Sequence, residues 1–300
     1  MATTYIDPST LPPDLPRKRR KFKISDIVTK VLFWLLVVLI LIYTVFPFVW
    51  ALLAAVKPND DISSTPTRYL PSKLYWGNLD YVFHNEDFLY ALRNSIVVSL
   101  ATVAIALVFG SLAAYALGRI KFRGRSATLY VILAMTMFPA IAILGSLFQM
   151  MRRFDLYNTI PGLVLTYMTF TLPFTVWVLA NFFKAMPGEL EEAALVDGST
   201  PFQAFYKIML PLALPGLVTT GLLAFIAAWN EFLFSLTFTN TYAARTVQPA
   251  IASFRGNSQF DEPWGSIMAA AVVVTVPLVV LVLVFQRKIL AGLTAGAVKG

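Results

Sequence analysis

The sequence has no cysteine and a single histidine, His84, among its 300 residues. The absence of cysteine excludes disulfides, thiol nucleophiles and thiolate metal sites. The GxxxxGK[ST] phosphate-binding loop, the HExxH metal motif and the GxSxG nucleophile motif are also absent. His84 precedes Asn85, Glu86 and Asp87, and such a histidine is more often a solvated loop residue than a ligand. We therefore expect no catalytic residue, no metal ligand and no cofactor bound by this chain, which should not be an enzyme.

Charged residues are scarce as well. They make up 13% of the chain, whereas apolar residues make up 58% and the mean hydropathy is +0.70. Soluble domains carry about 25% charged residues, so this composition predicts an integral membrane protein. The net charge of +8 is expected beside anionic lipid headgroups rather than on nucleic acid, because no basic face interleaved with aromatic residues is visible.

Several long segments contain no Asp, Glu, Lys or Arg at all. They cover residues 31–56, 94–118, 126–151, 156–183, 208–230 and 263–286. About 20 helical residues cross the hydrocarbon layer, and lipid offers backbone groups no hydrogen-bond partner, so each segment should be a helix. The sequence thus predicts an all-α fold, a polytopic membrane bundle of six transmembrane helices. The first segment is too long for the apolar core of a signal peptide and should remain as an anchor.

The positions of Lys and Arg predict the orientation. A basic cluster at residues 17–23 precedes the first apolar segment, and another at residues 119–125 follows the second. Such clusters favour the cytoplasmic side. The chain would therefore cross the plasma (inner) membrane six times, with both termini in the cytoplasm. Arg152 and Arg153 disagree, because this scheme places them outside; the two basic clusters outweigh that pair.

The chain divides into three parts by composition. Residues 1–27 form a proline-containing basic tail that we expect to be disordered and cytoplasmic, residues 28–290 form the membrane domain, and residues 291–300 form a short cytoplasmic tail of small residues. The two halves of the membrane domain show no repeat of the kind found in many secondary transporters.

Residues 188–209, which we call the elbow, are too polar to cross a membrane. Acidic residues begin a predicted helix over 189–197, and Gly198 follows where a left-handed residue would end it. Thr200 and Gln203 form a predicted capping box, with a second helix reaching about Met209. The elbow would display Ala193, Ala194, Leu195, Phe202, Phe205 and Tyr206 to another protein. The alternative is an amphipathic pair of helices that lies on lipid.

The elbow resembles the EAA signature of the membrane subunits of ATP-binding-cassette importers. The matching residues are Glu192, Ala193, Ala194, Asp197, Gly198, Ile208, Leu210 and Pro211. The resemblance implies a MetI-like type I importer permease, whose coupling helices sit in a cleft of a separate ATPase subunit.

More of the chain, from about residue 30 to the end, is similar to the MalG-type permeases of maltose and trehalose importers. The similarity includes residues 228–233, 256–260 and 292–300. It implies two copies of an ATPase that binds ATP and Mg, a sister permease that supplies the other half of the pathway, an extracytoplasmic sugar-binding protein, and contact with membrane lipid. It also implies that the tail, with Gly292, Leu293, Thr294, Ala295 and Gly296, reaches the ATPase, and that Gly256, Asn257, Ser258 and Gln259 contact the binding protein.

The solute and its contacts are less closely constrained. A maltose, maltodextrin or trehalose class of sugar is implied by the resemblance, and glycerol phosphate or another oligosaccharide is the alternative. Trp229, Asn230 and Glu231 offer a ring, an amide and a carboxylate suited to a sugar, and Glu231 is expected inside a membrane helix. The structural alternative is a packed Trp229 and a neutral or paired Glu231. A self-sufficient secondary transporter would need an ion site of its own, for which a single acid without repeats is little support.

Certain prolines and glycines predict where the membrane helices bend or approach each other. Pro47, Pro139, Pro173 and Pro277 interrupt predicted spans. Gly110 and Gly221 would allow close contact between helices. The alternative for each proline is static packing.

Overall fold

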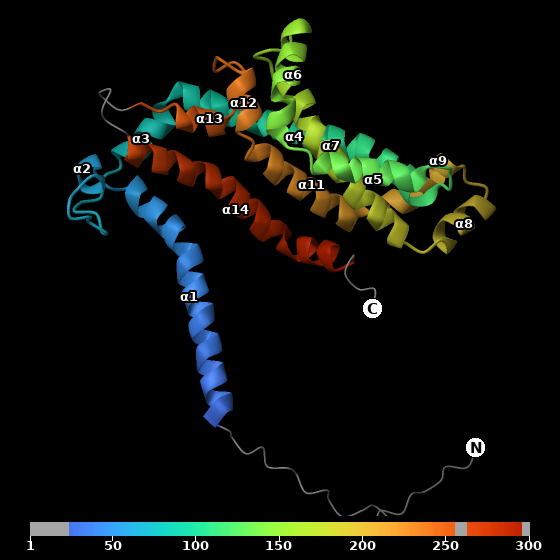
Figure 1. The fold of residues 1–300 in the computed structure, drawn as a ribbon, viewed down its shortest axis with the longest axis horizontal. Coiled ribbons are helices and arrows are strands. Elements are labelled where there is room, and N and C mark those ends of the chain that lie inside the picture. The colour runs from blue at the N-terminus through green and yellow to red at the C-terminus, as the bar shows by residue number, and fades with distance from the viewer. Residues whose placement is uncertain (1–23, 256–262, 296–300) are drawn as a thin grey trace, which may run out of the picture. The chain divides into compact units, whose positions relative to one another are not determined.

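The computed structural model describes residues 24–255 and 263–295, and within these ranges the chain is helical and contains no strand (Figure 1). The helices are α1 (Ile24–Ala55), α2 (Asn59–Ile62), α3 (Gly77–His84), α4 (Glu86–Arg119), α5 (Arg125–Thr136), α6 (Ala140–Arg153), α7 (Ile160–Ala185), α8 (Glu189–Val196), α9 (Pro201–Ala204), η2 (Phe205–Met209), α10 (Leu210–Leu212), α11 (Leu214–Trp229), α12 (Leu233–Phe238), α13 (Val247–Ala252) and α14 (Trp264–Ala295). Helix α1 starts at Ile24 and α14 continues to Ala295, so helical structure extends past both ends of the predicted membrane domain, residues 28–290.

Helix α1 belongs mostly to a first unit, residues 1–50, which is described by itself. It is a 32-residue helix with Pro47 inside it, so this proline does not end the helix. Its large apolar side chains are exposed along its length, for example Trp34 at 63% and Leu41 at 59%. A helix with such an exposed apolar surface is suited to lipid or to another membrane helix.

The second unit, residues 51–300, is built around α4 and α7, which share the most extensive interface among the described helices. Two glycines of α4 allow this approach: a Cβ added at Gly110 would lie 2.6 Å from Cγ2 of Thr175, and one at Gly118 would lie 2.9 Å from the carbonyl oxygen of Ala180. Helix α11 packs on both, and a Cβ at Gly221 would lie 3.0 Å from Leu107. The expectation of close contact at Gly110 and Gly221 is confirmed.

The third apolar segment is not one straight helix, contrary to the sequence expectation. Helices α5 and α6 meet at an angle of 91°, and in Figure 1 α6 stands away from the direction of α4 and α7. Pro139 is the residue before α6 rather than a kink within a helix. Proline lacks an N–H group and disfavours helical geometry at the residue before it, which accounts for a break here.

The fifth apolar segment is also bent. The helical stretch from Pro201 to Leu212 meets α11 at 73°, and Pro215 lies in the first turn of α11. Within the described residues, four helices are long and apolar enough to cross a membrane, and the number reaches six when each bent pair counts as one span. The structure therefore accommodates the predicted six segments, with two of them broken.

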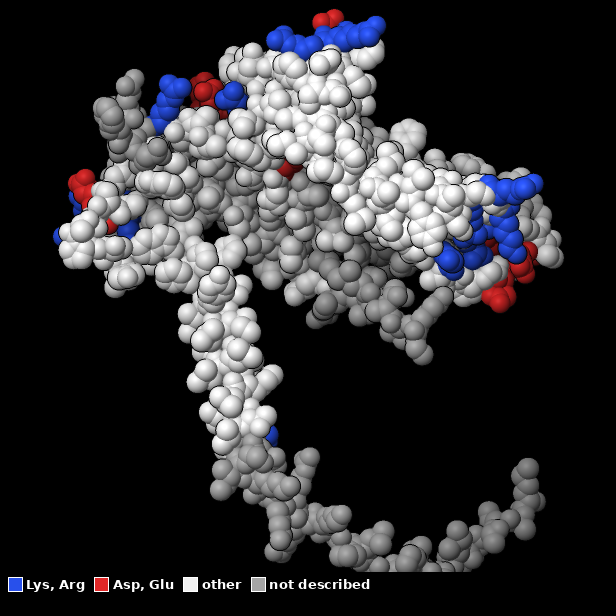
Figure 2. Space-filling model, in the orientation of Figure 1, with Lys and Arg blue, Asp and Glu red and all other residues white. Residues whose placement is uncertain are grey.

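The connecting segments gather at two opposite ends of the second unit. At one end, Nδ2 of Asn158 donates to Oγ1 of Thr241 (2.7 Å), and Nδ2 of Asn94 donates to the carbonyl of Tyr242 (2.8 Å). At the other end, Arg119 contacts Glu191. Figure 2 shows charged side chains near α8 and α9 and at the tip of α6, and the surface between them is almost entirely uncharged, with a small acidic patch near its middle. Six crossings require connecting segments at both ends of the helices, as found here.

Candidate functional site

Gly198 forms the turn of the elbow. Helix α8 ends at Val196, one residue earlier than expected, and Asp197 is its C-cap. Gly198 has a φ of +86°, in the left-handed region that residues with a Cβ rarely adopt. The N–H groups of Gly198 and Ser199 donate to the carbonyls of Leu195 (3.1 Å) and Ala194 (3.0 Å), which completes the end of the helix. The predicted left-handed turn is confirmed.

Thr200 begins the second helix of the elbow as predicted. The N–H of Gln203 donates to Oγ1 of Thr200 (3.2 Å), and the N–H of Thr200 donates to Oε1 of Gln203 (2.9 Å). These two bonds are the capping box, with Pro201 in the first turn where its missing N–H costs nothing. The turn between α8 and α9 is thus held by backbone geometry and caps on both sides.

The second helix does not stop at Met209, contrary to expectation. It passes through the π-helical turn η2 into α10, which ends at Leu212. The N–H of Leu210 bonds the carbonyl of Phe205, five residues back. Because Pro211 has no N–H to give to the carbonyl of residue 207, the wider turn lets the chain stay helical there. Single π-helical turns of this kind are frequent at functional sites.

The elbow presents one face outward and buries the other. Glu192, Ala193, Leu195, Val196, Asp197, Gly198, Phe202 and Tyr206 are exposed. Val196 is 87% exposed. We call these eight residues the outer face of the elbow. Figure 2 shows acidic and basic side chains at this end of the second unit.

Two residues expected on the outer face lie inside the chain instead. Ala194 is 3% exposed, and Phe205 is 4% exposed because its ring packs 4.9 Å from the ring of Tyr115. Phe205 turns inward because its ring packs on the rings of Tyr115 and Phe183, whereas Phe202 and Tyr206, one helical turn apart, are exposed. Ile208 and Leu210 are half-buried and Pro211 is exposed. Ala194 therefore supports the packing of α8 and does not contribute to the outer face.

A contact that the sequence did not suggest joins α8 to α4. The carboxylate of Glu191 accepts a hydrogen bond from the hydroxyl of Tyr115 (2.5 Å) and one from Nε of Arg119 (2.7 Å). Tyr115 and Arg119 are four residues apart on α4 and so share a face. This spacing is the one feature of the sequence that could have indicated that they share a partner. Their partner lies more than 70 residues later in the chain, where local patterns carry no information.

Trp229, Asn230 and Glu231 are near each other in the chain but face different surroundings. Trp229 is 1% exposed and its ring stacks on that of Phe225, with centroids 5.5 Å apart. Asn230 is exposed and its Nδ2 donates to the carbonyl of Ile226 (2.9 Å). The packed alternative for Trp229 is thus what the structure shows. A role for these residues in the substrate pathway stays a prediction.

Glu231 lies between two helices and not inside a membrane helix, contrary to expectation. Helix α11 ends at Trp229, and the two carboxylate oxygens of Glu231 accept the N–H groups of Phe234 (2.7 Å) and Ser235 (3.1 Å). These are free donors in the first turn of α12, where a negative charge is favourable. The acid therefore has partners within its own chain.

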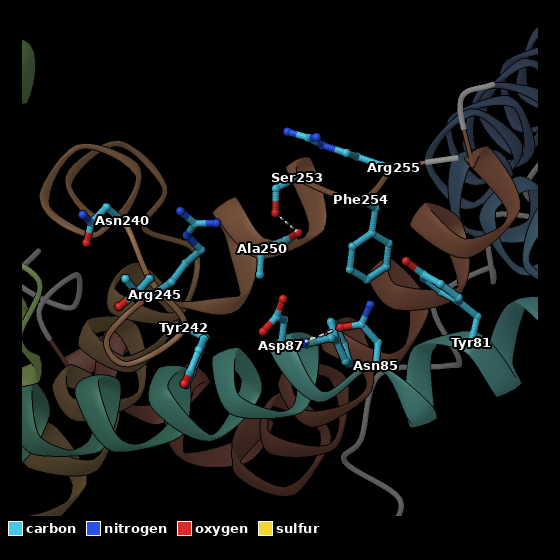
Figure 3. Close-up of a pocket in the computed structure, with 12 residues that line it drawn as sticks. Tyr81, Asn85, Asp87, Asn240, Tyr242, Arg245, Ala250, Ser253, Phe254 and Arg255 are labelled. Carbon is cyan, nitrogen blue, oxygen red and sulfur yellow. Dashed lines mark hydrogen bonds between the residues drawn. The ribbon is translucent and has the colours of Figure 1, made fainter. Parts of the chain in front are cut away.

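A pocket of about 550 Å³ lies at the other end of the second unit, where α4 begins (Figure 3). It combines aromatic rings, amides and charged groups, which come from Tyr81, Asn85, Asp87, Phe88, Asn240, Thr241, Tyr242, Arg245, Ala250, Ser253, Phe254 and Arg255. Figure 3 shows Asp87 near the middle, with Arg245 and Tyr242 to one side and Phe254 and Tyr81 to the other. Nε of Arg245 is enclosed and has no hydrogen-bond partner among the described residues.

The residues expected to contact the binding protein (256–259) and the ATPase (292–296) fall partly outside the described ranges. Gly256, Asn257, Ser258 and Gln259 follow directly after Arg255 of the pocket and lie outside them. Gly292, Leu293, Thr294 and Ala295 belong to the last turns of α14, and Gly296 lies beyond it, outside the described residues.

Comparison with known proteins gives a consistent result over most of the chain. Residues 106–294 match the family described as binding-protein-dependent transport system inner membrane component. The chain is 46% identical over 258 residues to the trehalose transport system permease protein SugB of Mycobacterium tuberculosis, covering 86% of this chain and 93% of that protein. It is 38% identical to the trehalose/maltose transport system permease protein MalG of Thermococcus litoralis, covering 92% and 99% of the two chains.

Solved structures support the fold. The chain is similar to a chain of a bacterial ABC transporter involved in the import of alginate, with a TM-score of 0.77 and 21% identity over 89% of this chain and 98% of that chain. It is also similar to a chain of the MetNI methionine ABC transporter, with a TM-score of 0.52 and 19% identity over 68% and 94%. The predicted all-α, MetI-like permease fold is confirmed. The chain belongs to the family of inner membrane components of binding-protein-dependent transport systems, and is a multi-pass transport subunit rather than an enzyme.

Proposed function

We propose that this chain is one of two transmembrane subunits of an ATP-driven importer for a sugar of the trehalose and maltose class. A sister permease would supply the other half of the pathway, and two copies of a separate ATPase would bind ATP and Mg. The sugar class rests on the identity of 46% to a trehalose permease and 38% to a trehalose/maltose permease. Another oligosaccharide or glycerol phosphate is the alternative.

The observation that carries the ATPase contact is the elbow. Its turn is fixed by Gly198 at a φ of +86° and by the capping box of Thr200 and Gln203, so it is preorganised. Its outer face exposes Val196 and Phe202 at 87% and 63% beside the carboxylate of Glu192. A rigid apolar patch next to a charge is the composition of a protein interface, whereas a lipid-facing helix would keep its acids away from the apolar side.

The elbow would act by differential binding. A closed ATPase dimer shifts the permease toward an outward-facing arrangement only when it binds that arrangement more tightly than the inward-facing one. The outer face of the elbow would make the contacts that differ between these two states. On this proposal the elbow and both termini lie in the cytoplasm.

The pocket at the start of α4 would receive the extracytoplasmic binding protein. It lies at the end of the second unit opposite the elbow, which would be the outer end if the elbow is cytoplasmic, and its residue Arg255 directly precedes the predicted contact residues 256–259. Asp87, Arg245 and Arg255 have no ion pair with one another among the described residues. Asp87 and Arg255 are exposed, so they offer a partner charges of both signs, and complementary charges favour specificity and rapid association.

Uptake by the reconstituted complex tests the sugar class. Proteoliposomes that contain this chain, its sister permease and the ATPase are supplied with the binding protein and with radiolabelled trehalose, maltose or glycerol 3-phosphate. We expect ATP-dependent accumulation of trehalose or maltose. Accumulation of glycerol 3-phosphate alone would support the alternative and contradict the proposed class.

A further inference from the structure

We infer that Glu191 is a positioning residue that transmits movement of α8 directly to α4 through Tyr115 and Arg119. The inference rests on the proposed function of the elbow and goes beyond it, because it says how displacement of the elbow would reach the membrane helices. The residue next to Glu191, Glu192, would have the separate task of contacting the ATPase. Neighbouring acids on one helix would thus serve two different partners.

The contact is short, partly enclosed and charged. Both carboxylate oxygens of Glu191 are used, one by the hydroxyl of Tyr115 at 2.5 Å and the other by Nε of Arg119 at 2.7 Å. The side chains of Arg119 and Glu191 are 12% and 18% exposed, and Tyr115 is 7% exposed. Charge-assisted bonds in such a setting are stronger than those at an open surface and less weakened by salt.

Arg119 also joins the end of α7 to this contact. Its Nη1 donates to the carbonyl of Met186 (3.0 Å), and Met186 is the C-cap of α7. One guanidinium therefore connects the last turn of α4, the end of α7 and the first turn of α8. Along the chain, α8 follows α7 after the short connection of residues 186–188.

The helices that receive the movement are packed tightly at this point. Gly118, next to Arg119, lies so close to α7 that an added Cβ would be 2.9 Å from both Ala180 and Phe183. Nε and Nη2 of Arg125 donate to the carbonyls of Leu117 (2.5 Å) and Gly118 (2.6 Å), which holds the end of α4. A force on Arg119 would consequently move α4 and α7 together and would not unwind the last turn of α4.

The geometry separates Glu191 from its neighbours on α8. Glu189 and Glu192 are exposed, whereas Glu191 points toward α4. Removing the charge of Glu191 should therefore leave the outer face of the elbow unchanged. This difference provides matched variants on a single helix turn.

The test compares Glu191→Gln, Glu192→Gln and Glu189→Gln in the complete complex of both permeases, the ATPase and the sugar-binding protein. Two quantities are measured in proteoliposomes: the affinity of the ATPase for the permeases and the number of sugar molecules transported per ATP hydrolysed. For Glu191→Gln we expect unchanged ATPase affinity and a transport ratio lower by at least about fivefold. Glu189→Gln should leave both quantities as in the original chain.

Two further variants guard against simple misfolding. Tyr115→Phe keeps the ring that packs on Phe183 and Phe205 and removes only the hydroxyl, so it should fold and lower the transport ratio in the same direction. The double variant Glu191→Gln with Arg119→Gln should have a transport ratio no lower than that of the worse single variant, because the two groups act as a unit.

Defined outcomes would overturn the inference. A transport ratio for Glu191→Gln and Tyr115→Phe equal to that of the original chain would do so. Loss of ATPase affinity in Glu191→Gln with an unchanged ratio in the complexes that form would show an ordinary ATPase contact. By contrast, unchanged ATPase affinity in Glu192→Gln would count against the proposed outer face while leaving the result for Glu191 interpretable.

Discussion

At the scale of single residues, the elbow depends on the backbone of Gly198. Its φ of +86° is accessible to glycine without strain, and an added Cβ would meet no atom within 4 Å. A substitution is therefore opposed by backbone conformation alone, by about 1–2 kcal/mol for a residue that avoids the left-handed region. Valine is such a residue, whereas asparagine enters this region more readily.

We expect Gly198→Val to insert into the membrane normally and to lose ATPase association and sugar uptake, because α8 and α9 would meet at a different angle. Gly198→Asn is the matched control and should retain most of both. Copurification of the ATPase and uptake in cells measure the two effects. Full uptake by Gly198→Val would argue against a coupling role for the turn.

Asp61 and Lys57 organise the segment after α1 by hydrogen bonds. Hydrogen bonds from the hydroxyl and the N–H of Ser72, and then from Arg68, hold the pKa of the Asp61 carboxyl below its ordinary value. Burial lowers the pKa of Lys57, and the nearby charge of Asp61 opposes that effect. Nζ of Lys57 donates to the carbonyl of Arg68 (2.7 Å), so both side chains hold the same loop.

The lowered pKa of Asp61 gives a pH dependence with a defined sign. A carboxyl whose pKa is lower in the folded state stabilises that state above its unfolded pKa, near 3.9, and the contribution disappears as pH falls through the folded value. We expect Asp61→Asn to lower the thermal midpoint at pH 7. The difference from the original chain should shrink steadily below about pH 4. Thermal unfolding in detergent measures it, and a difference that grows in acid would contradict this assignment.

At the scale of helices, local signals in the sequence were sufficient where the cause is local. Segments without charge predicted the membrane helices, and Gly198, Thr200 and Gln203 predicted the turn and caps of the elbow, because caps and left-handed turns involve only neighbouring residues. The break at Pro139 was expected only as a kink, since a proline alone does not determine whether a helix bends or stops.

Features that depend on distant packing could not be read from these signals. Phe205 turns inward because Tyr115 and Phe183 are there to receive it, and Glu231 caps α12 because α11 ends at Trp229. The contact of Glu191 with Arg119 joins residues far apart in the chain. Each of these outcomes is decided by how α4, α7 and α11 pack, and no single segment carries that information.

The outer face of the elbow makes a prediction at this scale. Val196 is 87% exposed on α8, so a charge there should not disturb the fold, yet it would be buried against the ATPase. We expect Val196→Asp to weaken ATPase association by tenfold or more, equivalent to about 1.4 kcal/mol. Leu74→Asp, at a 64% exposed leucine before α3, is the control and should have no effect on association. Equal binding of both variants would mean that Val196 faces lipid.

At the scale of the whole molecule, the closely packed pair α4 and α7 joins the elbow, which we propose binds the ATPase, to the pocket, which we propose faces outward. The elbow and the pocket lie at opposite ends of α4, which runs for 34 residues from Glu86 to Arg119. At about 1.5 Å per residue, a helix of that length is longer than the ~30 Å hydrocarbon layer, so it can carry a displacement from one end to the other. On the proposed function, the energy for such a displacement comes from the separate ATPase.

The most direct measurement is sugar accumulation by proteoliposomes with and without the ATPase. Vesicles that contain both permeases and the ATPase, with ATP inside and sugar-loaded binding protein outside, should concentrate sugar above the external level. Vesicles without the ATPase should show no accumulation, with or without an ion gradient. Concentrative uptake by this chain in the absence of the ATPase would contradict the account.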